Sequence, residues 1–219
     1  MSELKLHEDR FFSPVSEVRN TAREIYASIK SMPIVSPHGH VDPAIFAENK
    51  PFPNPTKLFH YIYRMLYSQG ISLEDLGIPD VNGNVSETNP KKSWKILAKK
   101  YYLFNGTPSG VWLDYEFNIV FGITEKLNEE NALKIYDELN EKIKSPEFLP
   151  RTLFDKFNIE ALSTTDAAAD DLEQHKKIKK SGWKGKIIPC FRPDAVTDLS
   201  NPNWKQNLKN LEKSVGFKI

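Results

Sequence analysis

The sequence predicts an α/β protein built on a parallel sheet, with a large helical block inserted after the first strand. Three short apolar segments have the length and the β-branched character of strands, and each ends in polar residues. Beyond residue 150, strand segments alternate with helical segments, which is typical of βαβ units in a parallel sheet. Between residues 44 and 150, helical periodicity dominates and there is almost no strand signal.

The N-terminal region is expected to contain one helix and the first strand. Apolar side chains recur at helical spacing over residues 14–31, and Ser13 is a suitable N-cap. Pro33 interrupts this pattern. The segment 33–37 then predicts a brief strand that runs directly into His38, Gly39 and His40.

The other predicted elements follow from the same periodicities. In the helical block, a helix around Leu58–Leu66 ends at Gly70, residues 80–90 form a surface loop, and further helices cover 91–104, 114–121 and 129–144. Later segments predict a short helix at 151–157, strands at 159–165 and 186–191, and helices at 170–180 and 203–215. The expected domains are 1–43 (the N-terminal helix and strand 1), 44–150 (the helical insertion) and 151–219 (βα units 2 and 3).

The composition excludes several classes of protein. The 219 residues are 39% hydrophobic and 27% charged, with a net charge of +1, so no general attraction to nucleic acid is expected. No apolar run approaches the roughly 20 residues that span a bilayer, and the N-terminus lacks the apolar core of a signal peptide. The single cysteine, Cys190, excludes an internal disulfide, and its apolar surroundings predict a place in the core. We therefore expect a cytoplasmic protein with no nucleic-acid or membrane partner, and a homo-oligomer remains open.

The first candidate site is the His-x-His sequence after the first strand. Alternate residues of extended chain point to the same side, so His38 and His40 can face one divalent metal ion. Gly39 allows the backbone to approach closely. The alternative is two ordinary histidines near a turn. Their position at the carboxyl end of a strand favours the metal site, because that end carries the active site in β/α barrels.

The second candidate site is the sequence Arg192-Pro193-Asp194, which follows the third strand. A guanidinium can hold a carboxylate through two parallel hydrogen bonds, which suits an acidic substrate. The alternative is a structural ion pair between Arg192 and either Asp194 or Asp166. Asp170 and Asp171 most simply cap the helix that follows them.

Several sequence blocks stand in a characteristic order. MPIVSPHGHVDP is followed by IFAENKPF and HYIYR, and later by FNIEALSTTDAAADDLEQH and IIPCFRPD. In this combination the chain resembles the uronate isomerases, also called glucuronate isomerases, of the amidohydrolase superfamily, from about residue 10 to residue 200. The resemblance implies a partial (β/α)8 TIM-type barrel, amidohydrolase-like, with a large helical insertion after strand 1.

The resemblance also implies an activity and a set of site residues. The reaction is an aldose–ketose isomerisation of small-molecule hexuronates, D-glucuronate to D-fructuronate and D-galacturonate to D-tagaturonate. The implied metal ligands are His38 and His40, with zinc as the first candidate for the divalent metal, and the implied substrate-binding residues are Arg192, Asp194, Tyr61 and Arg64.

The length leaves this site incomplete. A β/α barrel takes about 250 residues without insertions, and three strands cannot close one. We expect the chain to be the N-terminal portion of a longer enzyme whose remainder supplies the catalytic base and an aspartate metal ligand. The 219 residues alone are then expected to be inactive and to bind metal weakly. Two alternatives stay open, a metal-dependent hydrolase of the same superfamily and a non-catalytic truncated homologue whose helical block mediates interactions.

Overall fold

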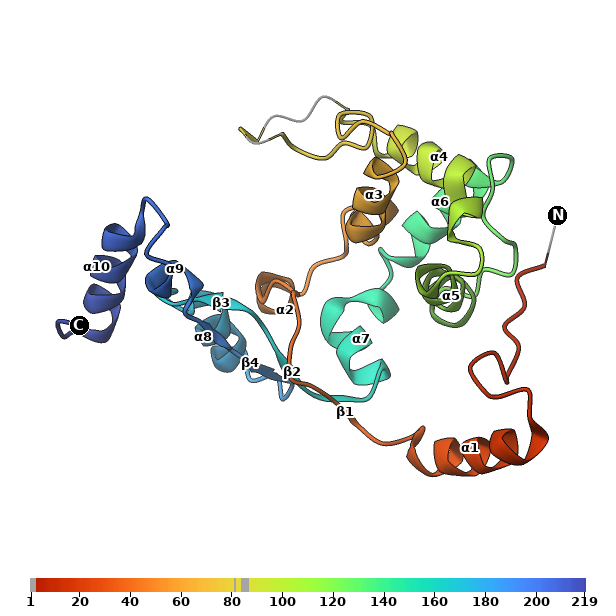
Figure 1. Ribbon diagram of the computed structural model, residues 1–219, viewed down its shortest axis with the longest axis horizontal. Coiled ribbons are helices and arrows are strands. Elements are labelled where there is room, and N and C mark those ends of the chain that lie inside the picture. Colours follow the sequence, from red (N-terminus) through yellow and green to blue (C-terminus); the bar gives the residue numbers. More distant parts are fainter. Residues whose placement is uncertain (1–2, 81, 84–86) are drawn as a thin grey trace. The chain divides into compact units, whose positions relative to one another are not determined.

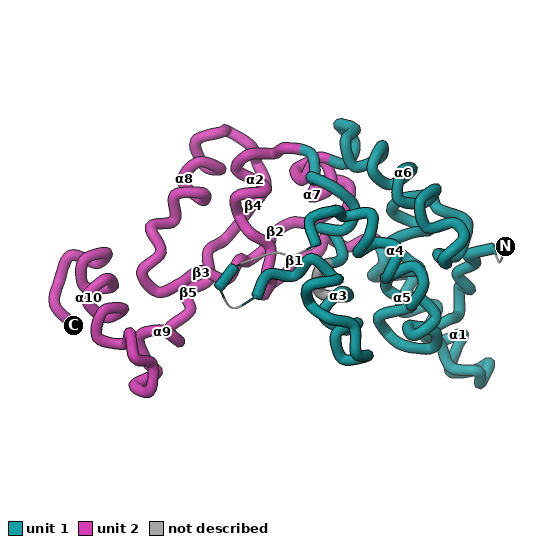
Figure 2. The backbone as a smooth tube through the Cα atoms, turned by 90° about the horizontal axis from the view of Figure 1, so that it is seen from above, with its two compact units in different colours: residues 1–30, 51–148 teal, residues 31–50, 149–219 magenta. Residues whose placement is uncertain are grey.

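The computed structural model describes residues 3–80, 82–83 and 87–219, and the side chains of His60 and Tyr61 also lie outside this description. The chain divides into two compact units (Figure 2). Unit 1 comprises Met1–Lys30 and Pro51–Phe148, and unit 2 comprises Ser31–Lys50 and Leu149–Ile219.

This division differs from the expected one at residues 43 and 150, because the N-terminal segment packs on the helical block. Leu4 is buried, its N–H donates to the Thr124 carbonyl at 2.7 Å, and Asn118 donates to the Leu4 carbonyl at 3.2 Å. The first thirty residues therefore belong to the helical unit, while the first strand belongs to unit 2.

Unit 2 is built on the predicted parallel sheet, which is confirmed. Strands β1 (Ile34–Ser36), β2 (Ile159–Ser163) and β4 (Lys186–Ile188) pair in the order β1-β2-β4, all parallel (Figure 1). Beyond their carboxyl ends, a second and smaller parallel sheet joins β3 (Asp166–Ala167) to β5 (Phe191–Arg192). The helices of unit 2 are α2 (Ala44–Glu48), α7 (Pro150–Lys156), α8 (Glu173–Lys180), α9 (Asp194–Thr197) and α10 (Trp204–Val215).

One face of the unit 2 sheet is covered and the other is open. Buried side chains from β2, α2, α7 and α8 form the core on the covered face, namely Leu162, Phe46, Phe154 and Ile178. Ile187 packs against this core, in register with Leu162. On the alternate positions, Val35 and Ile188 keep 60% and 46% of their surface exposed. Parallel sheets are normally covered on both faces, so this apolar face lacks a cover within the described chain.

Unit 1 is helical, as the periodicity predicts. Its helices are α1 (Ser16–Ile29), α3 (His60–Tyr67), α4 (Pro90–Lys100), α5 (Pro108–Tyr115) and α6 (Ala132–Lys142), with 3₁₀ turns at Pro55–Lys57, Tyr101–Phe104 and Pro146–Phe148 and a π-helical turn at Glu116–Val120. No helix of the described residues is both long and apolar enough to cross a membrane.

An aromatic cluster forms the core of unit 1. Trp94 is fully buried, and its Nε1–H donates to the Ala132 carbonyl at 2.7 Å. Its ring lies 6.0 Å from Phe59, 5.7 Å from Tyr136 and 6.3 Å from Phe117, measured between centroids. These edge and tilted contacts are the arrangements that aromatic rings prefer, so α4 is tied to the elements around it.

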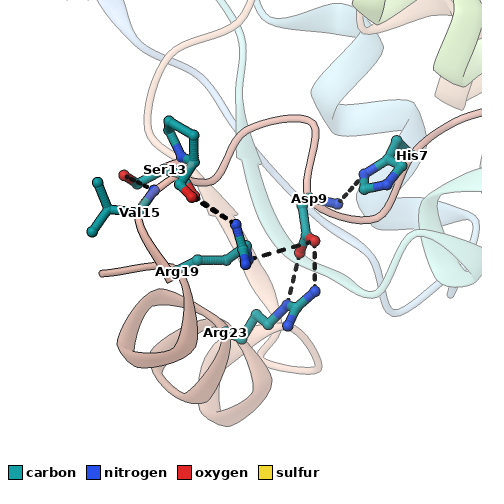
Figure 3. A network of polar contacts seen from close by, with 7 residues as sticks. His7, Asp9, Ser13, Val15, Arg19 and Arg23 are labelled. Atoms are coloured by element: carbon teal, nitrogen blue, oxygen red, sulfur yellow. Dashed lines mark hydrogen bonds and ion pairs between the residues drawn. The ribbon is translucent and has the colours of Figure 1, made fainter. Parts of the chain in front are cut away.

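A polar network joins α1 to the segment before it (Figure 3). Arg23 donates two hydrogen bonds to the Asp9 carboxylate, from Nε at 2.7 Å and from Nη2 at 2.5 Å. Ser13 does not act as the expected N-cap, since α1 begins at Ser16 and Val15 occupies that position. The Ser13 hydroxyl instead accepts from the Val15 N–H at 3.2 Å.

Two element boundaries differ from the predicted ones for local reasons. Helix α5 begins at Pro108 rather than 114, because Thr107 caps it through a hydrogen bond from the Gly110 N–H at 3.0 Å. The predicted strand 186–191 is divided into β4 and β5, with Pro189, which has no N–H to donate, between them. The predicted loop 80–90 includes positions outside the described residues.

Candidate functional site

The His-x-His pair lies directly after β1, and its two imidazoles converge. The Nε2 atoms of His38 and His40 are 3.0 Å apart, and the ring planes meet at 80°. Both side chains are exposed to solvent. The two rings therefore lie on one side of the chain, with their Nε2 atoms within hydrogen-bond distance of each other.

Gly39 permits this arrangement through a close backbone contact. A Cβ atom at this position would lie 3.0 Å from the Ser163 carbonyl oxygen at the end of β2. Few real Cβ atoms approach an oxygen so closely, so a side chain here would push the His-x-His segment away from β2. The Ser36 hydroxyl also donates to the His38 carbonyl at 3.2 Å, which fixes the start of the turn.

The pair has the geometry of two ligands of one metal ion. With Zn–N distances of about 2.0–2.1 Å and tetrahedral angles, two ligand nitrogens stand about 3.3 Å apart. The observed separation of 3.0 Å between the Nε2 atoms is close to that value. Among the described residues, no three His, Cys, Asp or Glu side chains gather as a metal-binding group. The residues present therefore fit two positions of such a site.

A polar cavity of about 410 Å³ opens beside His40. Its walls come from the segment after β1, the β2–β3 junction and the start of α8, and they carry many carboxylates; the lining includes Asp42, Thr165, Asp166, Asp170, Asp171, Glu173 and His175. Asp170 and Asp171 do not occupy the N-cap of α8 as expected, since Leu172 holds that position; their Oδ1 atoms instead accept from the Leu172 and Glu173 N–H groups at 2.7 and 2.9 Å.

Arg192 and Asp194 lie together at the end of β5. The Arg192 Nε donates to Asp194 Oδ2 at 3.2 Å, and both side chains are at least half exposed. Of the two ion pairs considered for Arg192, the one with Asp194 is observed. An exposed ion pair of this kind contributes little to stability, so the guanidinium is free to exchange partners.

The two remaining predicted substrate residues lie on α3 in unit 1. Arg64 is exposed and lines a cavity of about 260 Å³ with Thr56, Lys57 and Tyr63. Tyr61 belongs to the same helix, and its side chain lies outside the described residues. Their roles in binding substrate stay predictions.

A buried polar network beside the cavity was not predicted from the sequence. Thr164, Asp166 and His175 bond to one another, although they come from the β2–β3 junction and from α8. The only sequence signal was their spacing in the block TTD-x(3)-DDL-x(2)-H. The prediction that Cys190 packs in the core is wrong, because the strand ends before it and its side chain is exposed.

Comparisons with known proteins identify the family of the chain. The profile of the glucuronate isomerase family matches residues 7–219. The chain is 47% identical over 212 residues to a uronate isomerase of Brucella canis, covering 95% of this chain and 46% of that protein. It is 49% identical over 219 residues to a uronate isomerase of Nostoc punctiforme, covering 98% and 46%.

Solved structures give the same result. The crystal structure of glucuronate isomerase from Caulobacter crescentus matches with a TM-score of 0.93 at 43% identity, covering 98% of this chain and 46% of that one. The uronate isomerase of Thermotoga maritima matches with a TM-score of 0.81 at 27% identity, covering 97% and 45%. The chain spans about half the length of the relatives it matches. With a family match over residues 7–219 and converging histidines after its first strand, this chain belongs to the glucuronate isomerase family.

Proposed function

We propose that this chain forms the N-terminal part of a uronate isomerase that interconverts D-glucuronate with D-fructuronate and D-galacturonate with D-tagaturonate. The observation that carries the proposal is the convergence of the His38 and His40 Nε2 atoms, 3.0 Å apart, in a chain of this family. The names of the relatives favour the isomerase over a hydrolase of the same superfamily.

The fold of the whole enzyme would be a (β/α)8 barrel. Two features of unit 2 support this: the three parallel strands have unpaired outer edges, and one sheet face is apolar and exposed. Further parallel strands would pair with these edges and bury Val35 and Ile188 inside the barrel. The active site would then lie at the carboxyl ends of the strands, where His38, His40 and Arg192 are found.

His38 and His40 would hold a divalent metal, zinc being the first candidate. When bound, such an ion supplies a positive charge that polarises an oxygen of the sugar. The two imidazoles act as neutral ligands, which requires that each offers an unprotonated Nε2. The further ligand and the catalytic base would come from the part of the enzyme that this chain does not contain.

Arg192 would bind the substrate carboxylate. The bond to Asp194 engages the Nε edge of the guanidinium and lies in solvent, so a hexuronate carboxylate can replace Asp194 in a bidentate pair. Asp194 in turn could accept a hydrogen bond from a sugar hydroxyl. The reaction itself moves the C2 proton of the aldose to C1 of the ketose through an enediol, and fixing the carboxylate at C6 sets the distance of C1 and C2 from the base.

A chimera tests the proposal. Residues 1–219 are joined to the C-terminal remainder of the Caulobacter crescentus relative, and ketose formation from D-glucuronate is measured with added zinc. We expect turnover by the chimera, a loss of at least 100-fold in His38→Ala and in His40→Ala, and a raised KM in Arg192→Ala. A folded chimera whose two histidine variants retain full activity would overturn the metal role.

A further inference from the structure

The small sheet that carries Arg192 begins at a break in the main sheet. Strand β4 ends at Ile188, and β5 begins at Phe191. In the β3–β5 pair, Asp166 is in register with Phe191, and Ala167 with Arg192. The position of Arg192 relative to β2 therefore depends on what holds residues 189–191 against β3.

Asp166 bonds to both main-chain polar groups of Cys190, within this break. Its main-chain N–H donates to the Cys190 carbonyl at 3.0 Å, and its carboxylate Oδ2 accepts from the Cys190 N–H at 3.0 Å. The Asp166 carboxylate thus bonds to the Cys190 N–H, a donor that in a regular parallel ladder would bond to a backbone carbonyl. Pro189 offers no N–H of its own, so the bonds to Cys190 are the first after β4 ends.

The Asp166 carboxylate is itself fixed by a buried chain of donors. Its Oδ2 also accepts from the Thr164 hydroxyl at 2.7 Å, and Thr164 is fully buried. The Thr164 oxygen lies 2.9 Å from His175 Nε2. A Thr164 hydroxyl that donates to Asp166, the shorter of its two acceptor contacts, can accept from His175 when Nε2 carries the imidazole proton. The network therefore links β2, α8 and the β4–β5 break.

We propose that Asp166 is a positioning residue that holds Arg192 at the substrate carboxylate by fixing the Cys190 backbone. The inference rests on the proposed role of Arg192 in binding substrate. Asp166 acts through the β4–β5 break: without its carboxylate, the Cys190 N–H loses its acceptor, and the backbone that leads from Cys190 to Arg192 is held less firmly.

The first test measures the bond directly, without activity. Cys190 is the only cysteine of the 219 residues, so [15N]cysteine labelling gives a single amide signal in the chain. We expect Asp166→Ala to accelerate hydrogen exchange of that amide at least 10-fold. Asp166→Asn retains a carbonyl oxygen and should restore most of the protection. Asp170→Asn, an exposed carboxylate of the same cavity wall without a bond to Cys190, is the matched control. Unchanged exchange in Asp166→Ala would overturn the proposal; should that variant fail to fold, Asp166→Glu, which displaces the acceptor, takes its place.

The second test asks whether this bond acts on Arg192. In the chimera, Asp166→Ala should raise the KM for D-glucuronate about 10-fold with a smaller change in kcat. The double variant Asp166→Ala/Arg192→Ala should then match Arg192→Ala alone, since a guanidinium that is absent cannot be misplaced. Independent, multiplying effects would overturn the positioning role and leave the proposed function intact. An unchanged KM in Arg192→Ala would overturn the substrate role of Arg192 and this inference with it, whatever the Cys190 amide shows.

Discussion

The core on the covered face of the unit 2 sheet stabilises the unit that carries the candidate site. Phe154 on α7 is 3% exposed. Its ring centroid lies 5.9 Å from Phe46 and 5.0 Å from Trp183, both in edge-to-face contact. Replacing a buried Phe by Ala costs about 3–5 kcal/mol, and aromatic pairs add about 0.5–1.5 kcal/mol each beyond burial. Measured Phe→Ala costs already include such ring contacts, so we expect Phe154→Ala to lower the free energy of unfolding by about 4 kcal/mol.

Urea unfolding followed by circular dichroism measures this loss. Phe157→Ala is the matched control, because Phe157 ends the same helix and is 39% exposed. It should cost less than about 1 kcal/mol. Since domains are stable by only about 5–15 kcal/mol, Phe154→Ala should also weaken zinc binding at the His-x-His pair. Equal losses in the two variants, or a cost below about 1 kcal/mol for Phe154→Ala, would refute the assignment of this core.

Three further predictions concern unit 1. Trp94→Phe removes the hydrogen bond to the Ala132 carbonyl and leaves a small cavity. It should lower the free energy of unfolding in urea by about 2–3 kcal/mol, and a change near zero would contradict the buried hydrogen bond. Burial raises the pKa of Glu116 from 4.5 to about 7, so its contribution to stability is full below pH 4.5 and is lost as the pH rises through 7. Glu116→Gln should therefore flatten the pH dependence of the melting temperature between pH 5 and 8. An unaltered profile would exclude a raised pKa of Glu116. The hydrogen bond from Arg23 lowers the pKa of Asp9, so wild-type stability should fall as the pH drops below the ordinary Asp range. Asp9→Asn should make that fall smaller in acid titrations monitored by circular dichroism, and an equal fall in the two proteins would contradict this.

Local patterns in the sequence predicted the elements that local forces build. The strand before His38 and the helix of residues 16–29 follow from apolar periodicity, and both are found. Polar residues at the strand ends correctly indicated where the strands stop: His38 and His40 follow β1, and Arg192 closes β5 of the second, smaller sheet. The predicted helix 114–121 starts too late, although Thr107 followed by Pro108 is itself a signal for the start of a helix.

Contacts between distant segments could not be predicted from the sequence. Asp166 and Cys190 are 24 positions apart, and their bond exists only because β3 and β5 are brought together. The exposure of Cys190 likewise depends on where β4 ends, which apolar character alone does not fix. Residues 1–30 belong to the helical unit partly through the bonds of Leu4. The segment around Leu4, before the first helix, carries no strand or helix signal in the sequence.

The proposed metal site requires that His38 and His40 hold one ion together. Long-range 15N–1H NMR of the chain during titration with zinc tests it most directly, because it reports each imidazole nitrogen separately. We predict that the Nε2 signals of His38 and His40 shift together and saturate at one zinc per chain, that His7 and His175 do not respond, and that either alanine variant abolishes the shift of its neighbour. A response of only one of the two imidazoles, or the same response at His7, would contradict the account.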